Sequence, residues 1–181
     1  EFLEHKCVKC TRTVQNGCEW VLEGKGYATE KLDGTCCLIM DGKIYRRFDY
    51  KKGRRLPKGA IPCQESADEI TGHFPHWVLC DKDNPNDKYH MSAFNKKQEW
   101  ENGTYELIGE HFQGNPYKID GDVLEKHGQR ILDVTPSFDG IKEFLTNNNI
   151  EGLVFYNGEG QMCKIKRTDF GLEWNNRKSK H

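Results

Sequence analysis

The sequence predicts an α+β protein built from antiparallel β-sheets with flanking helices. Two patterns favour this class. Short apolar and β-branched runs are joined by tight turns such as Asp41-Gly42, which is typical of antiparallel hairpins. One stretch, residues 138–145, instead carries apolar residues at helical spacing. With 181 residues, the chain is expected to form a single domain, residues 1–181, with ample length for a core.

The first predicted hairpin lies in the first third of the chain. Residues 35–40 (Thr-Cys-Cys-Leu-Ile-Met) have the composition of a strand, and residues 43–49 that of a returning strand after the two-residue turn. Successive side chains of a strand alternate, so the adjacent Cys36 and Cys37 are expected to point to opposite faces.

The middle of the chain is less regular. Residues 51–103 are rich in Pro, Asp, Asn and Lys and show weak periodicity. This composition predicts loops with short elements, and one interpretation is a lid or a substrate-facing insertion. Strands are predicted again at residues 104–112, which carry Glu106, and at residues 129–134.

A helix is predicted after Thr135-Pro136, which offers an N-cap and a first-turn proline. Asn147-Asn148-Asn149 is expected to end it. The apolar stripe of this helix is interpreted as core rather than as a binding surface, and it consists of Phe138, Ile141, Phe144 and Leu145.

The last predicted hairpin pairs residues 150–156 with residues 161–166 around Asn157-Gly158. Glu151 lies on the first strand, and Lys164 and Lys166 lie on the second. Because these lysines are two positions apart, both point to one face of the strand. That pattern suits a half-buried strand poorly unless the face meets something anionic.

The composition limits the class of protein. Hydrophobic content is 35%, mean hydropathy is −0.85, and no apolar run approaches the roughly 20 residues of a membrane span. We therefore expect an intracellular protein without a membrane partner. Of the eight cysteines, Cys7-x-x-Cys10 forms a lone pair without a second pair at zinc-finger spacing, so reduced thiols are expected.

The formal net charge of −1 conceals a basic stretch at residues 43–58. A basic stripe on a near-neutral protein favours a local phosphate contact, although a solvated hairpin end would look similar. The cations most suited to a nucleic-acid phosphate path are Lys51, Lys52, Arg54 and Arg55.

Five side chains together suggest chemistry on a nucleoside triphosphate. Lys31 stands in Lys-x-Asp-Gly just before the first hairpin, and two carboxylates and two lysines follow it along the chain. An amine nucleophile, metal-binding acids and phosphate-neutralising cations are what attack on an α-phosphate requires. The later four residues are Glu106, Glu151, Lys164 and Lys166.

The order of these residues resembles motifs I, III, IV and V of the covalent nucleotidyltransferases, which comprise DNA ligases, RNA ligases and capping enzymes. Three runs are similar to the vertebrate-type ATP-dependent 5′–3′ RNA ligase and its viral relatives. They are residues 29–37, Glu-Leu-Ile-Gly at 106–109 with Gly-Asn-Pro-Tyr at 114–117, and Ile-Glu-Gly at 150–152. The resemblance covers about residues 28–174. It implies a nucleotidyltransferase (ATP-grasp-like ligase) catalytic domain and a covalent lysyl-AMP intermediate.

The resemblance also implies roles for residues near the nucleophile. Asp33 would orient Lys31 or a metal-bound water, and Glu30 would help to read the purine edge. An arginine soon after the nucleophile is expected to bind ATP, and of the two candidates, Arg46 and Arg47, we favour Arg47.

Further along the chain, Glu106 resembles the acid near the ribose and Glu151 the acid on the metal side, so both are candidate ligands for Mg²⁺, for which Mn²⁺ can substitute. Lys164 and Lys166 would contact the triphosphate. The family usually stacks an aromatic residue on adenine, but this chain has Arg-Ile-Leu-Asp-Val at 130–134, so Leu132 or Val154 is expected to pack the base.

The function that follows is an ATP-dependent RNA ligase for RNA repair, monomeric and without an obligatory protein partner. It would join an RNA 3′-hydroxyl to a 5′-phosphate through lysyl-AMP and an adenylylated RNA end. Only fifteen residues follow Lys166, too few for the oligonucleotide-binding barrel of DNA ligases and capping enzymes. The alternatives are the catalytic domain of such an enzyme and a non-catalytic module that binds RNA ends.

Overall fold

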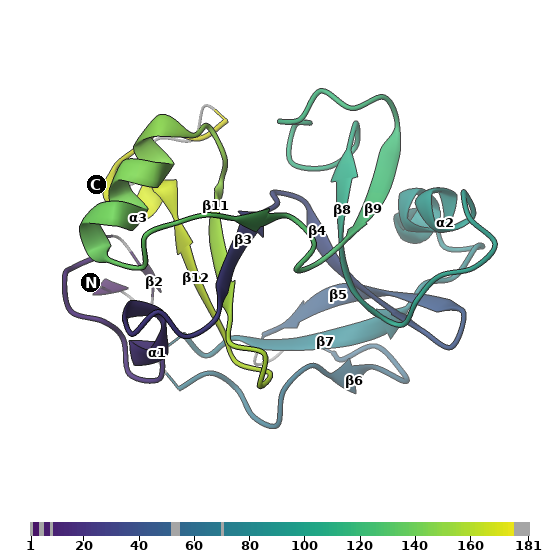
Figure 1. The fold of residues 1–181 in the computed structure, drawn as a ribbon. Coiled ribbons are helices and arrows are strands. Elements are labelled where there is room, and N and C mark those ends of the chain that lie inside the picture. The colour runs from purple at the N-terminus through teal and green to yellow at the C-terminus, as the bar shows by residue number, and fades with distance from the viewer. Residues whose placement is uncertain (1, 4–5, 8, 52–54, 70, 176–181) are drawn as a thin grey trace. The chain divides into compact units, whose positions relative to one another are not determined.

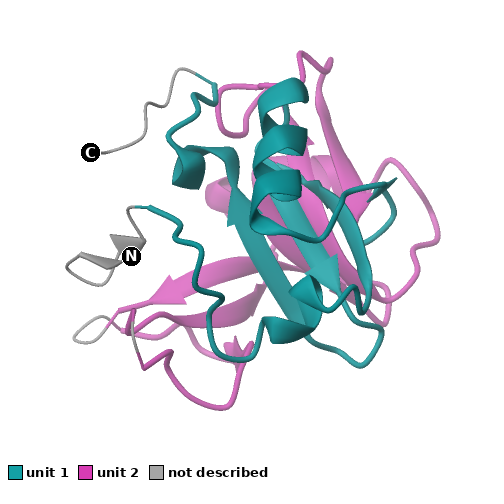
Figure 2. Cartoon of the chain, turned by 60° about the vertical axis from the view of Figure 1, so that its left-hand side comes forward, with its two compact units in different colours: residues 1–32, 128–181 teal, residues 33–127 magenta. Residues whose placement is uncertain are grey.

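The computed structural model describes residues 2–3, 6–7, 9–51, 55–69 and 71–175 (Figure 1). The chain is α+β with antiparallel strand pairing throughout these residues, as predicted. It divides into two compact units, which Figure 2 colours separately. Unit 1 comprises residues 1–32 and 128–181, and unit 2 comprises residues 33–127.

Unit 1 is built on a four-stranded sheet with the order β10-β3-β11-β12. Its helices pack on one face of that sheet, where Ala28, Leu153 and Phe155 meet Ile141 and Leu145 in a buried core. The strands are β3 (Tyr27–Lys31), β10 (Ile131–Leu132), β11 (Gly152–Tyr156) and β12 (Met162–Lys166), with a separate pair β1 (Phe2–Leu3) and β2 (Lys6–Cys7). The helices are α1 (Glu19–Leu22), α3 (Phe138–Asn147) and the 3₁₀-helix η2 (Arg167–Phe170).

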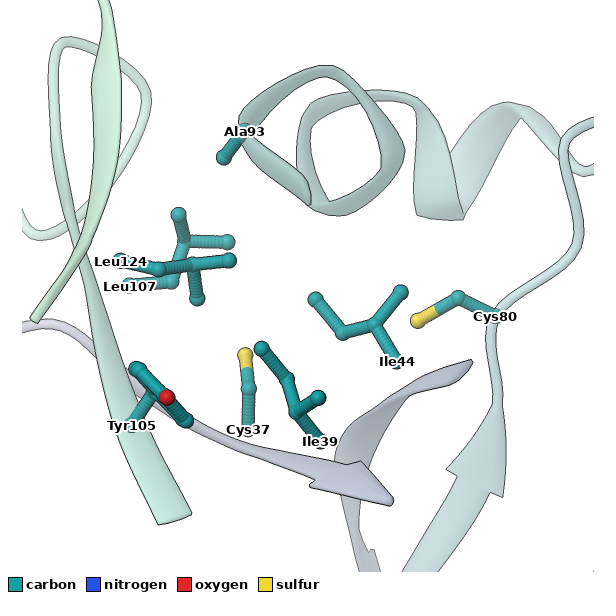
Figure 3. Packing of buried hydrophobic residues seen from close by; sticks show 8 residues of the cluster. All are labelled: Cys37, Ile39, Ile44, Cys80, Ala93, Tyr105, Leu107 and Leu124. Atoms are coloured by element: carbon teal, nitrogen blue, oxygen red, sulfur yellow. The ribbon is translucent and has the colours of Figure 1, made fainter. Parts of the chain in front are cut away.

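Unit 2 is built on a six-stranded sheet with the order β6-β7-β5-β4-β8-β9. Figure 3 shows its core, where side chains of β4, β5, β8 and β9 gather beneath Ala93 of α2. The strands are β4 (Thr35–Met40), β5 (Lys43–Tyr50), β6 (Ile61–Pro62), β7 (Phe74–Leu79), β8 (Gly103–Gly109) and β9 (Asp122–Lys126). The helical elements are η1 (Pro85–Asp87) and α2 (Lys88–Phe94).

The predicted first hairpin is confirmed. Strand β4 has the predicted bounds, β5 extends one residue further than predicted, and Asp41 and Gly42 turn the chain with φ values of 51° and 69°. Both residues are left-handed, as a type I′ turn requires. The adjacent cysteines face opposite sides as predicted, since Cys37 is fully buried in the core and Cys36 is half-buried on the other face.

Other predicted elements need correction. Helix α3 begins at Phe138, and Ser137 rather than Thr135 is its N-cap, because the Ser137 hydroxyl accepts from the Gly140 N–H. The strand predicted at 129–134 is reduced to Ile131–Leu132. The middle segment is more regular than predicted, since β7 lies inside the six-stranded sheet between β6 and β5 and is part of the scaffold.

The expectation that all thiols are reduced is wrong for one pair. Cys18, at the start of α1, forms a disulfide with Cys163 of β12, within unit 1. Cys36, Cys37, Cys63 and Cys80 are free thiols. In the part of the chain that the structure describes, no helix has the length and apolar character needed to cross a membrane.

Candidate active site

Three lysines of unit 1 share one face of its sheet, because the strand register places them there. In β11, Gly152 pairs with Lys31 of β3 on one side and with Lys166 of β12 on the other. Two residues further along β11, Val154 pairs with Lys164 in the same way. Directly paired residues point to the same side of a sheet, so the three amines form a cationic face opposite the core of unit 1.

Gly152 at the centre of this face must be glycine. A β-carbon at this position would lie 2.3 Å from the Ile165 carbonyl oxygen and 2.8 Å from the Lys166 α-carbon. The Ile-Glu-Gly run therefore allows β12 to approach β11 closely, which brings Lys166 alongside the row that contains Lys31.

Glu151 precedes this glycine and contacts the candidate nucleophile. Its Oε2 lies 2.6 Å from the Lys31 Nζ, in an ion pair whose carboxylate residue is only 7% exposed. Its backbone carbonyl accepts from the Arg167 N–H, which fixes the start of β11. The fold thus brings together Lys31 and Glu151, which lie 120 residues apart in the sequence.

Glu30 lies beside the candidate nucleophile on β3 and is held by Arg130. The Arg130 guanidinium lies 3.1 Å from the Glu30 carboxylate, and the Glu30 N–H donates to the Arg130 carbonyl. These two contacts fix the position of β3 next to β10.

The pairing of β10 with β3 decides which side chains are available to a base. Ile131 pairs with Thr29 and shares its face, which is also the face of Val154 and the lysines, and Ile131 is 66% exposed. Leu132 points the other way and packs against the core of unit 1. Leu132 therefore points away from the lysine face, whereas Val154, the other residue predicted to pack the base, lies on that face together with Ile131.

In unit 2, the Asp33-Gly34 part of the Lys-x-Asp-Gly motif is held by a loop and by β8. The Asp33 N–H donates to the Tyr117 hydroxyl, and the Gln113 amide donates to the Gly34 carbonyl. A β-carbon on Gly34 would lie 2.2 Å from the Leu107 carbonyl oxygen. The glycine of the motif is therefore required by its close approach to β8. The tyrosine of the Gly-Asn-Pro-Tyr run, Tyr117, holds the backbone of Asp33 in place.

Glu106 of β8 sits in a polar cluster on the face of the unit 2 sheet opposite the core. Its Oε1 accepts from the Gly34 N–H at 3.0 Å, and its Oε2 lies 2.9 Å from the His127 Nε2. Cys36 pairs directly with Glu106 across the β4–β8 ladder. Sequence reasoning missed His127 and Cys36 as neighbours of Glu106, because only the register of three strands brings them together.

Burial raises the pKa of the Cys36 thiol to about 12, and the Glu106 carboxylate adds to this effect. The neighbouring Arg47 guanidinium acts in the opposite direction on the same pKa. Cys36 is therefore a protonated thiol at neutral pH in the absence of a ligand.

The two candidate arginines of β5 have different environments. Arg46 pairs at 2.7 Å with Asp87, which is 1% exposed on the α2 side of the sheet. Arg47 lies on the opposite face with Cys36 and has the Asp49 carboxylate 3.5 Å from its Nε. Arg46 thus lies on the core side of the sheet, and Arg47 lies on the face that carries Cys36 and Glu106.

The remaining predicted residues are only partly described. Lys52 and Arg54 of the basic stretch lie outside the described residues, whereas Lys51 and Arg55 are described and exposed. A cavity of about 370 Å³ in unit 1 lies elsewhere, between residues 9–15 and the core. Its largely apolar lining includes Lys164 but lacks Lys31, Glu151 and Lys166, so we place the site at the lysine face instead.

The predicted magnesium ligands fit that ion unequally. Magnesium is usually bound by one or two carboxylates together with substrate phosphates. Glu151, beside the amine of Lys31, fits that pattern, whereas Glu106 lies among a thiol and an imidazole, which hard cations do not favour.

Fold and geometry together define an α+β protein with a lysine face and a carboxylate beside its candidate nucleophile. A model of the family described as RNA ligase 1 matches residues 96–180 of the chain. Glu106, Glu151, Lys164 and Lys166 fall inside that stretch, and Lys31 lies before it.

Curated relatives extend the similarity to more of the chain. It is 26% identical to RNA ligase 1 of Pongo abelii over 223 residues, which covers 81% of this chain and 67% of the relative. It is 24% identical to RNA ligase 1 of Rattus norvegicus over 224 residues and 26% identical to that of Danio rerio over 220 residues, covering 81% of this chain and 68% of each relative. The predicted resemblance to a vertebrate-type RNA ligase is confirmed.

Proposed function

We propose that this protein is an ATP-dependent RNA ligase that works through a covalent lysyl-AMP. The single observation that carries the proposal is the lysine face of unit 1. There, Lys31, Lys164 and Lys166 flank β11 on one side of the sheet, and the Lys31 amine meets a nearly buried carboxylate.

In the first step, the Lys31 Nζ attacks the α-phosphorus of ATP. A P–N bond forms, the bond to the bridging oxygen breaks, and pyrophosphate leaves. The amine must first lose a proton, and Glu151, 2.6 Å away, is the nearest base. Lys164 and Lys166 bind the phosphates and stabilise the charge that develops on them. Magnesium, when bound with Glu151 among its ligands, supplies further charge neutralisation.

In the two later steps, AMP passes from Lys31 to an RNA 5′-phosphate, and an RNA 3′-hydroxyl then attacks that phosphate and releases AMP. Glu106, Glu30 and Arg47 are assigned to ATP, and Asp33 to orienting the nucleophile. The basic stretch containing Lys51, Lys52, Arg54 and Arg55 is our candidate path for the RNA backbone. Such contacts position a strand without reading its sequence.

The choice of RNA rests on the similarity to proteins named RNA ligase 1. That similarity disfavours the two alternatives, a DNA ligase or capping-type catalytic domain and a non-catalytic RNA-end-binding module. An RNA ligase must distinguish its substrate through 2′-hydroxyls or A-form geometry.

A joining assay on matched strands tests the proposal. The protein receives ATP, Mg²⁺ and nicked or single-stranded substrates with a 5′-phosphate, in all-RNA and all-DNA versions of one sequence. We expect sealing of RNA that needs both ATP and the 5′-phosphate and that falls steeply with added salt. Equal sealing of DNA would indicate a general polynucleotide ligase, and no sealing with no adenylylation would indicate a binding module.

A further inference from the structure

We propose that Cys36, Glu106 and His127 form a binding site for a borderline-soft divalent metal ion such as Zn²⁺. This inference does not rest on the proposed function. It concerns a different ion from the magnesium expected with ATP, it shares Glu106 with the residues assigned to ATP, and it stands on the geometry of unit 2 alone.

The three side chains present the right atoms at the right spacing. The thiol sulfur, one carboxylate oxygen and one imidazole nitrogen all lie within 4.8 Å of one another. A tetrahedral zinc ion, with ligands near 2.0–2.3 Å, places its ligand atoms roughly 3.3–3.6 Å apart. Small side-chain rotations therefore suffice to close the cluster on an ion, and in the described residues this is the one group of its kind.

The strand register fixes these positions, so the cluster is built into the sheet. Cys36 pairs with Glu106 across β4 and β8, and the His127 N–H donates to the Thr104 carbonyl, two residues before Glu106 on β8. All three side chains are half-buried. A site assembled on adjacent strands loses little conformational entropy when it binds an ion.

Outer contacts orient two of the three ligands. The His127 Nδ1 lies 3.0 Å from the Thr104 hydroxyl, which leaves its Nε2 directed at Glu106. The Gly34 N–H occupies the other Glu106 oxygen. Such partners fix the tautomer and orientation of metal ligands. Three protein ligands leave a fourth position for water or a small ligand, as in open zinc sites.

The surrounding charges are mixed. Burial raises the pKa of the Cys36 thiol and the nearby Arg47 guanidinium opposes that rise, so a bound ion must displace the thiol proton. Glu125 pairs directly with Glu106 on β9 and brings a second carboxylate to the same face, which offsets the arginine. Thiol, imidazole and carboxylate together suit zinc or cobalt and not magnesium or calcium.

The test uses Co²⁺ as a spectroscopic probe and Zn²⁺ for affinity, without nucleotide. Both are titrated into protein in which Cys7 and Cys10 are replaced by serine, so that the N-terminal pair does not contribute. We expect one Co²⁺ to bind with a thiolate-to-cobalt charge-transfer band, and Zn²⁺ to displace it and raise the melting temperature.

Variants assign the ligands. Cys36→Ser should abolish the band, and His127→Gln should weaken Zn²⁺ binding at least tenfold. Thr104→Val, which removes only the outer contact, should weaken it by about tenfold. Cys63→Ser, at another half-buried thiol of unit 2, is the matched control and should bind normally.

Absence of the band in the parent protein would overturn the proposal, as would its persistence in Cys36→Ser or its loss in Cys63→Ser. A folded-state check by circular dichroism accompanies each variant. If Cys36→Ser does not fold, His127→Gln decides, and unchanged Zn²⁺ affinity in that variant would also overturn the proposal.

Discussion

Arg46 and Arg47 are neighbours in the sequence but belong to opposite faces of β5. Arg46 forms an ion pair with the buried Asp87 carboxylate, and Arg47 lies beside Cys36 on the face of Glu106. Composition and spacing alone left both as candidates for the ATP-binding arginine. The alternation of a strand separates them once the core side of the sheet is known.

The two arginines predict opposite phenotypes. Arg46→Ala should lower the free energy of unfolding by about 3–5 kcal/mol, because it leaves the Asp87 carboxylate buried without its cation. Arg47→Ala should leave stability within about 0.5 kcal/mol and slow self-adenylylation by about 10²-fold. Urea unfolding and single-turnover labelling of each variant measure both quantities. A stable Arg46→Ala protein with impaired labelling would reverse the assignment.

Lys166 and Lys164 are expected to act on phosphates and not on folding. Replacing either with alanine should cost about 2.7–4 kcal/mol in kcat/KM for adenylylation, by analogy with the loss of a transition-state donor. Lys142→Ala, an exposed lysine of α3, is the matched control and should be silent. Labelling at the native rate under subsaturating ATP in a Lys164 or Lys166 variant would make that residue a solvated charge.

At the scale of elements, hairpins were predicted better than isolated strands. The hairpin of β4 and β5 was predictable because Asp41-Gly42 is a strong turn signal. The pairing of β10 with β3 joins distant parts of the chain, as the contact of Glu30 with Arg130, 100 residues apart, illustrates, and no local pattern specifies it. For the same reason the sequence does not show that Ile131, and not Leu132, shares the lysine face.

Two variants in strand β10 test directly which of its side chains contacts the base. Ile131→Ala should raise the KM for ATP roughly five- to thirtyfold, the equivalent of about 1–2 kcal/mol of lost apolar contact with the base, and leave stability unchanged. Leu132→Ala should instead cost about 2 kcal/mol of stability, because its side chain packs in the core. Steady-state labelling at varied ATP and thermal unfolding separate the two effects. An Ile131→Ala protein with unchanged KM would place the base elsewhere.

At the scale of the whole molecule, the motif order identified the kind of protein better than any single element did. Lys31, Glu106, Glu151, Lys164 and Lys166 are predicted as one group. The fold places four of them in unit 1 around β11, whereas Glu106 belongs to unit 2. The Cys36–Glu106–His127 cluster of unit 2 was not predicted. Its members are drawn from three places in the chain, and no local spacing pattern joins them.

The ion pair of Lys31 with Glu151 determines which substitution tests the proposed nucleophile. Treated as a surface residue, Lys31 would tolerate alanine with a stability change within about 1 kcal/mol. Its partner Glu151 is 7% exposed, so removing the cation leaves a carboxylate buried without charge compensation and should cost more than that. Arginine preserves the positive charge but is never deprotonated near neutral pH, so it cannot act as the nucleophile.

The central claim, that Lys31 carries the covalent AMP, is tested most directly by intact-protein mass spectrometry after incubation with ATP and Mg²⁺. We predict a single AMP adduct on the wild-type protein, mapped by peptide analysis to Lys31, and none on a folded Lys31→Arg protein. The adduct should also be absent when a chelator removes the metal. An adduct on Lys31→Arg, or one that maps to Lys164 or Lys166, would contradict the account.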